Sequence, residues 1–478
     1  MHLDRETDLQ EIAAGADKSA MRSINRAPTG INITEAEEVF VAVTSEEAII
    51  APDAGGSDDL AEKKAEGQPK KLRFLIHRNF GLLWSGQAVS EFGSRITREG
   101  LPLAANLTLH ANASQMGLLA ALGSAPVLVI GLFAGVWVDR VRRRPVMIVS
   151  DLARAALLVT IPLAAMLGLL HIEQLYVVTA LVGMLTIFYE VANRSFLPGL
   201  VGREQIIEAN SKLSASGSLA EIGGPTLAGV LVQALTAPLA ILFDVVSFLV
   251  SALCAGLIRV REPAPGREVG RQRAWREIRE GLRLVSGNPL LRAVAGSSAL
   301  RNFSGGAFAA LYGLYVIREL GVSPALFGLL VTAGGAGALP GAFAAGRFVR
   351  RFGIGRVLIG ALLLSAVISL LTPLAGGPGS VAYTMLFAGQ LVGDFGLEIY
   401  FISEVSLLQM LVPDQSLGKA SASMRFLVEG MIPVGAILAG VLGTVWGMRM
   451  TLLAGCIGFC LSALWLMFSP LRTMQQSK

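Results

Sequence analysis

The segment GVWVDRVRRRP, residues 135–145, follows a long uncharged stretch and sets one acid beside four arginines. A basic cluster directly after an apolar helix is typical of a helix end held on the inner side of a membrane. The rest of the chain fits this setting, because 53% of its residues are hydrophobic and only 16% are charged. Apolar stretches long enough to cross about 30 Å of hydrocarbon recur from Phe80 to Pro470. The sequence therefore predicts a polytopic membrane protein.

Apolar length, together with Gly, Pro and charged residues between the stretches, predicts an all-α fold with twelve spans. The expected spans cover residues 79–105, 112–138, 145–170, 173–198, 204–235, 238–258, 289–318, 323–350, 355–375, 379–410, 414–445 and 448–470. Basic residues gather in alternate connections, and only Arg318 and Arg449 lie in the others. This positive-inside pattern predicts a multi-pass protein of the plasma (inner) membrane with both termini in the cytoplasm.

The chain also repeats itself at an offset of 211 residues, which places Gly135 on Gly346 and Val146 on Val357. The repeat predicts two six-helix halves. The first seventy residues hold fifteen acidic and seven basic residues and predict a disordered tail. The expected domains are a cytoplasmic tail over 1–70, a six-helix bundle over 71–258, a cytoplasmic linker with an amphipathic helix over 259–288, a second bundle over 289–470, and a cytoplasmic C-terminus over 471–478.

Several function classes are excluded. The basic excess is accounted for by topology, so no nucleic-acid partner is expected. No GxxxxGK[ST] loop and no Ser, His and acid arrangement is evident, which argues against an ATP-driven pump and an enzyme. Cys254, Cys456 and Cys460 lie in apolar spans without CxxC spacing, so neither a disulfide framework nor a metal site is expected.

The opening segment resembles the loop signature of the major facilitator superfamily between helices two and three. The matching positions are Gly135, Asp139, Arg140, Arg143 and Arg144, while Arg142 stands where many members have Gly. The resemblance implies that Asp139 contacts the start of helix eleven, at residues 414–418, and latches the halves together when the transporter opens outward. The alternative is an aspartate that merely offsets neighbouring arginines in water.

A second resemblance concerns direction of transport. GGPTLAGVLV, residues 223–232, resembles the Gly-Pro signature of exporters in helix five, with Gly224, Pro225 and Gly229 matching and Ala228 in place of one glycine. Helix packing by small residues is the alternative. Other segments resemble the drug:proton antiporter branch that holds macrolide-efflux and siderophore-export proteins.

Charges inside spans cost about 3 kcal/mol each on insertion scales, so each is a functional candidate. Glu91, Arg95 and Glu99 share one helix face, with Arg98 beside it, and Glu91 lies near the midplane. Glu91 is the first proton-site candidate, unless it is permanently paired with Arg95. Other candidates for the cavity are Asp394 and Glu398, after which come Glu221, Asp244 and Arg301. Candidates for a cytoplasmic gate are Asp151, Glu190 and Arg194, together with Arg154, Glu208, Lys212, Glu404, Lys419 and Arg425.

These patterns predict a secondary transporter that exports amphipathic small molecules of drug, macrolide or siderophore type by proton antiport with alternating access. The alternatives are a nutrient importer on the same fold and a non-transporting membrane sensor or scaffold. The expected energy source is the proton gradient, without a cofactor. The expected partners are a small-molecule substrate and membrane lipids, and the protein is expected to be a monomer.

Overall fold

A computed structural model describes residues 70–138, 140–202, 205–260, 262, 271–376 and 379–473. The chain forms two compact units, Met1–Arg73 and Phe74–Lys478. The predicted tail and Asp139 lie outside the described residues, apart from Lys70. The features discussed below belong to the second unit. The first described helix begins slightly before it, at Lys70.

The secondary-structure elements of the described residues are all helices, and no strand occurs among them, as the apolar spacing predicts. The first helix group consists of α4 (Lys70–Leu103), η1 (Ala104–Thr108), α5 (Ala113–Val138), α6 (Arg143–Met166), α7 (Ile172–Val201), α8 (Ile206–Ala234), α9 (Ala237–Ala240) and α10 (Leu242–Leu257). The helix α11 (Arg271–Gly287) follows. The second helix group consists of α12 (Pro289–Arg318), α13 (Pro324–Phe352), α14 (Ile354–Ser369), α15 (Leu371–Leu374), α16 (Gly379–Leu411), α17 (Asp414–Glu429), α18 (Met431–Val445), α19 (Met448–Met467) and η2 (Pro470–Thr473).

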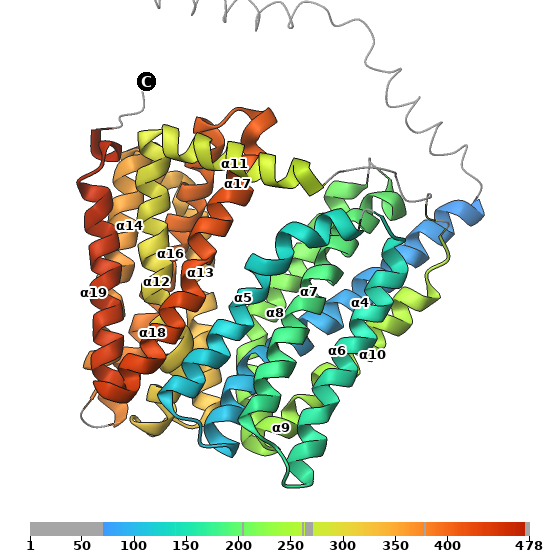
Figure 1. Cartoon of the computed structure of the whole chain (residues 1–478), viewed down its shortest axis with the longest axis horizontal. Helices are drawn as coiled ribbons and strands as arrows, with labels where there is room; N and C mark the ends of the chain where they lie inside the picture. The colour runs from blue at the N-terminus through green and yellow to red at the C-terminus, as the bar shows by residue number, and fades with distance from the viewer. Residues whose placement is uncertain are drawn as a thin grey trace, which may run out of the picture. The chain divides into compact units, whose positions relative to one another are not determined.

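Seven helical segments of the described residues are long and apolar enough to cross a membrane. They are α6, α7, α9 with α10, α13, α14 with α15, α17 with α18, and α19. Length and composition thus confirm seven of the twelve predicted spans. For α4, α5, α8, α12 and α16 the span remains a prediction, although these helices run alongside the others in Figure 1.

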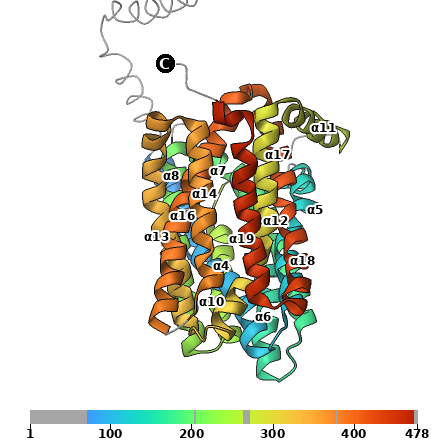
Figure 2. The same cartoon turned by 90° about the vertical axis from the view of Figure 1, so that its left-hand side faces the viewer.

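The two helix groups are visible as separate bundles in Figure 1. Within the first group α6 packs on α7 and α10, and α5 packs on α7. Within the second group α16 packs between α13 and α14, and α19 packs between α14 and α12, which gives the row of helices seen in Figure 2. The groups meet mainly where α5 crosses α18 and where α8 crosses α13.

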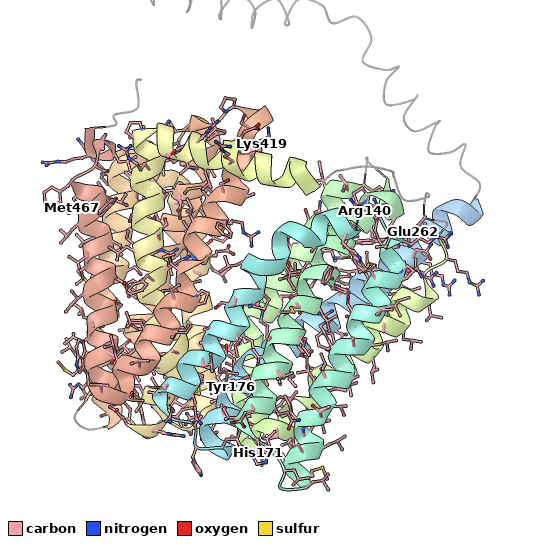
Figure 3. All side chains as sticks on the ribbon, in the orientation of Figure 1. Arg140, His171, Tyr176, Glu262, Lys419 and Met467 are labelled. Carbon is pink, nitrogen blue, oxygen red and sulfur yellow. The ribbon has the colours of Figure 1, made fainter. Side chains whose placement is uncertain are left out.

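The two ends of the molecule differ in charge. One end holds the α5–α6 connection with Arg140, and α11 lies at the same end; we call it the arginine-rich end (Figure 3). The opposite end holds the short connections between α6 and α7, where His171 lies, and between α8 and α9.

The 211-residue repeat also holds for helix contacts. On α4, a Cβ at Gly93 would overlap the Ser247 hydroxyl of α10. At the equivalent contact in the second group, a Cβ at Gly458 of α19 would overlap the Ser304 hydroxyl of α12. The small residue and the serine have exchanged helices, but the close approach is the same.

Candidate functional site

The first crossing between the groups is built on glycines. A Cβ on Gly117 of α5 would lie only 2.7 Å from the Cα atom of Gly440 on α18. The Ser114 hydroxyl donates a hydrogen bond to the Gly440 carbonyl at 3.2 Å. Because glycine has no side chain, the two backbones pack directly on each other. These residues lie near the start of α5 and the end of α18, at the opposite end of the molecule.

The second crossing, between α8 and α13, is the symmetry mate of the first. A Cβ on Gly229 would lie 3.1 Å from the Cα atom of Gly328, and these two glycines stand 211 residues from Gly440 and Gly117 respectively. The hydroxyls of Thr226 and Thr332 add a hydrogen bond of 2.7 Å. The sequence singles out Gly229 as a site residue, and the repeat aligns it with Gly440; Gly117 and Gly328 were not singled out.

The other two residues of the helix-five motif have separate contacts. The Pro225 carbonyl lies against Gly328, where any Cβ would collide with it. Gly224 instead faces α4, where a Cβ would lie 3.0 Å from Cγ of Arg95. The motif therefore serves both the crossing between the groups and the contact between α8 and α4.

Arg95 forms an ion pair with Glu221 on α8. Arg98 approaches the same carboxylate, with Nη1 3.6 Å from Oε1 of Glu221. Within the described residues Glu91 has no salt-bridge partner, so the structure does not show the alternative in which Glu91 pairs with Arg95. The bare backbone of Gly224 lets α4 approach α8, which explains why Arg95 is paired across helices.

In the second group, Asp394 and Glu398 lie four residues apart on α16. The Asp394 carboxylate fills the space beside Gly334 of α13, and Cβ of Glu398 lies beside Gly341. Neither carboxylate has a salt-bridge or hydrogen-bond partner among the described residues. A carboxylate without a cation in a membrane protein is costly to keep charged, which makes both groups candidates for proton or cation binding.

Tyr312 on α12 lies between the groups and was not singled out from the sequence. Its hydroxyl is buried without a hydrogen-bond partner. It is close enough to Asp394 and Glu99 for their charges to act on it. Glu99 of the first group and Asp394 of the second group are thus both within electrostatic range of this tyrosine.

The predicted gate residues separate into two places. Glu190 and Arg194 form an ion pair of 3.7 Å with side chains 58% and 75% exposed. Asp151 is instead fully buried and paired with Arg154, whose guanidinium lies 4.7 Å from the ring of Tyr189. Asp151 thus belongs to the interior of the first group and does not join the exposed pair.

The arginine-rich loop is attached to the residues after α10. The Glu262 carboxylate accepts hydrogen bonds from the backbone N–H groups of Arg143 at 2.6 Å and Arg144 at 2.9 Å. The Arg144 side chain donates to the Ala255 carbonyl at 2.8 Å. Glu262 thereby satisfies the free N–H groups at the start of α6. Glu262 was not predicted as a site residue from the sequence. Of the predicted loop residues, Gly135 lies within α5 and Arg140 lies in the connection that follows.

Charged side chains on α4 and α8 have large exposed fractions. In the ion pair of Glu208 with Lys212, the side chains are 69% and 51% exposed, and the Arg98 side chain is 64% exposed. The described residues contain no cluster of His, Cys, Asp and Glu arranged to hold a metal ion.

Residues 71–478 match the family described as transmembrane secretion effector, a family of major facilitator transporters. The chain belongs to this family. It is therefore a multi-pass membrane transporter of small molecules, and it is not an enzyme, as the sequence predicts.

Two relatives and one solved fold are similar to the chain. The multidrug efflux pump Tap of Mycolicibacterium fortuitum is 27% identical over 76% of this chain and 90% of its own. Macrolide efflux protein A of Streptococcus pyogenes is 24% identical over 83% of this chain and 97% of its own. A bacterial homologue of the iron transporter ferroportin, 18% identical, superposes in its inward-facing state with a TM-score of 0.67, over 82% of this chain and 98% of its own. The same protein in its outward-facing state reaches 0.51, over 83% of this chain and 100% of its own.

Proposed function

We propose that the protein exports amphipathic small molecules of drug, macrolide or siderophore type in exchange for protons, with alternating access. The observation that carries this proposal is the pair of glycine crossings at one end, combined with exposed charges towards the other. Such an arrangement corresponds to a central cavity closed at the opposite end and open at the arginine-rich end. The TM-scores of 0.67 and 0.51 with the two states of the ferroportin homologue support the same conformation.

The arginine-rich end is proposed to face the cytoplasm, because basic connections stay on that side of the plasma membrane. The open cavity would then receive substrate from inside the cell. Cysteines placed at Arg142 and Arg347 should both react with membrane-impermeant reagents only from the cytoplasmic side. Labelling of the two positions from different sides would contradict the topology.

Export is favoured over import by two observations. The second crossing contains Gly229 and Pro225 of the helix-five motif, which resembles the signature of exporters. Two relatives are named as efflux proteins. A membrane sensor or scaffold would need neither the crossings nor the unpaired carboxylates at the cavity.

Protons are the proposed counter-ion, and the proton gradient would supply the energy without a cofactor. The candidate carriers are Glu91, Glu99, Asp394 and Glu398, because none has a salt-bridge partner among the described residues. A carboxylate takes up a proton more readily when its surroundings become dry, and loses it when water returns. Asp139 is proposed to latch onto the start of α17 in the outward-open state.

The decisive experiment reconstitutes the purified protein, expected to be a monomer, into proteoliposomes with an imposed pH gradient. A panel of antibiotics and siderophores, first screened on a deletion strain, supplies the substrates. An exporter should move substrate against its gradient while protons flow the other way, and collapse of the gradient should stop it. Symport of substrate with protons would indicate an importer, and no movement of any compound would indicate a sensor or scaffold.

A further inference from the structure

A chain of polar groups joins α12 to α16 away from the carboxylates discussed above. The hydroxyls of Tyr400 and Ser298 lie 2.7 Å apart, and the Ser298 hydroxyl lies 2.5 Å from Oε1 of Glu404. Tyr400 is fully buried, and Glu404 is partly buried. Glu404 is a gate candidate by sequence, together with Lys419 and Arg425, but in the structure its hydrogen-bond partner is Ser298.

The positively charged neighbour of these hydrogen-bonded side chains is Arg301. Its guanidinium lies 4.6 Å from the ring centre of Phe401 and 5.6 Å from that of Tyr400. It is only 9% exposed, and it forms no salt bridge among the described residues. It is nevertheless close enough to act electrostatically on Glu404. The carboxylate therefore has a nearby positive charge without being locked into an ion pair.

The charged side chains named for the neighbouring helix α17 have partners of their own. Arg425 of α17, which packs on α12, is paired with Glu429 at 2.9 Å. Lys419 is paired with Glu280 of α11 at 2.7 Å. The groups that act on the Glu404 carboxylate are thus Arg301, Ser298 and Tyr400.

The first helix group has the same contact without the charge. Gln87 and Asn193 stand 211 residues before Ser298 and Glu404, and the Gln87 carbonyl oxygen accepts a hydrogen bond of 2.9 Å from the Asn193 amide. A neutral pair thus suffices to join the two helices in the first group. The carboxylate of the second group adds a negative charge to this contact, and with it the ability to bind and release a proton.

We propose that Glu404 is a further proton carrier of the transport cycle, beside the candidates named above, an inference that rests on the proposed proton antiport. Hydroxyl groups both donate and accept, so the order of donor and acceptor along Tyr400, Ser298 and Glu404 can reverse. With Glu404 ionised, Tyr400 donates to Ser298 and Ser298 donates to the carboxylate. With Glu404 protonated, its O–H donates to Ser298, which donates to Tyr400. Glu404 lies seven residues before the end of α16. It therefore takes its proton from the proposed cavity between the groups and releases it to water at the arginine-rich end.

The transport test compares Glu404→Asn, which copies the residue of the first group, with the control Asn193→Ala. In proteoliposomes with a trapped pH dye, we expect Glu404→Asn to retain downhill exchange within about twofold but to move fewer protons per substrate, with an altered pH profile. Asn193→Ala should lower the substrate and proton rates together and leave their ratio unchanged. An unchanged ratio and pH profile in Glu404→Asn would overturn the proposal.

A second measurement does not depend on transport. Infrared difference spectra of the purified protein across a pH titration should show the carbonyl band of a protonated carboxyl group that Glu404→Asn and Glu404→Gln both remove. If no such band is lost, Glu404 does not titrate and the proposal fails, while gradient-driven export by the wild type can still be observed. If the wild type moves no protons at all, the proposed antiport fails first.

Discussion

Arg95 of α4 forms its ion pair with Glu221 of α8, not with Glu91 on its own helix. The pair crosses between two helices of the first group, beside the glycine that admits α4 to α8. Because the Arg95 side chain is 19% exposed and that of Glu221 54% exposed, water reaches the acid more easily than the base. Any proton or cation that binds Glu221 would release Arg95 towards Glu91 or Glu99.

Glu221→Gln should therefore weaken export without preventing insertion. An ion pair this exposed is worth about 1 kcal/mol, so a conformational equilibrium should change about fivefold. Rates of export in proteoliposomes measure the effect. The charge-reversed double variant, Arg95→Glu with Glu221→Arg, should recover part of the lost rate. If the double variant instead lost as much rate as the two single variants together, the ion pair would have no role in export.

The glycine crossings predict matched effects in the two halves. Gly440→Val and Gly229→Val should each separate the backbones at the opposite end and shift the protein towards the outward-open state. Cysteines introduced at Ser114 and Val441 should then crosslink less in both variants. Gly360→Val is the control, because nothing lies within 4 Å of a Cβ at Gly360. A change in only one of the two variants would show that the crossings are not equivalent.

The latch is tested by removing one charge. Asp139→Asn should leave expression normal and slow export, because the neutral amide interacts less with the helix dipole at the start of α17. Asp139→Glu should retain more activity. Wild-type rates for Asp139→Asn at equal expression would leave the aspartate as a simple counter-charge to its arginines.

Glu262 should matter for the same loop. Glu262→Ala removes the acceptor of two backbone N–H groups at the start of α6, a loss of about 1 kcal/mol by analogy with other helix caps. We expect a lower melting temperature and faster hydrogen exchange at Arg143 and Arg144. Glu262→Asp, which keeps the charge on a shorter side chain, should restore part of the protection, and identical exchange in both variants and the wild type would contradict the capping role.

Sequence patterns predicted the helical spans and the loop signature because hydrophobic length and basic clusters are local properties. Partners across helices were not predictable in the same way. Arg95 and Glu221 lie far apart in the sequence, and their pairing depends on how α4 and α8 are rotated about their axes. The spacing of Glu91, Arg95 and Glu99 identified a shared face but could not show that α8 would pair with the arginine.

The internal repeat held more information than the motifs alone revealed. Its offset places Gly117 on Gly328 and Gly229 on Gly440, so both crossings can be read from the sequence once one is known. The buried position of Asp151 could not be inferred, because its place near one end of a helix says nothing about which side of that helix faces the interior of the group.

Glu91 remains the first candidate for coupling proton movement to export. It lies on the helix that carries Arg95, and no salt bridge holds it ionised among the described residues. Glu91→Gln keeps the size and hydrogen-bonding capacity of the side chain but cannot carry the charge. We therefore expect it to abolish uphill efflux driven by a pH gradient, while substrate binding and downhill exchange persist. Glu173→Gln, at an exposed position in the first turn of α7, serves as the control with unchanged transport. If Glu91→Gln retained uphill transport with the usual pH dependence, the coupling role would pass to Glu99 first and then to Asp394 or Glu398.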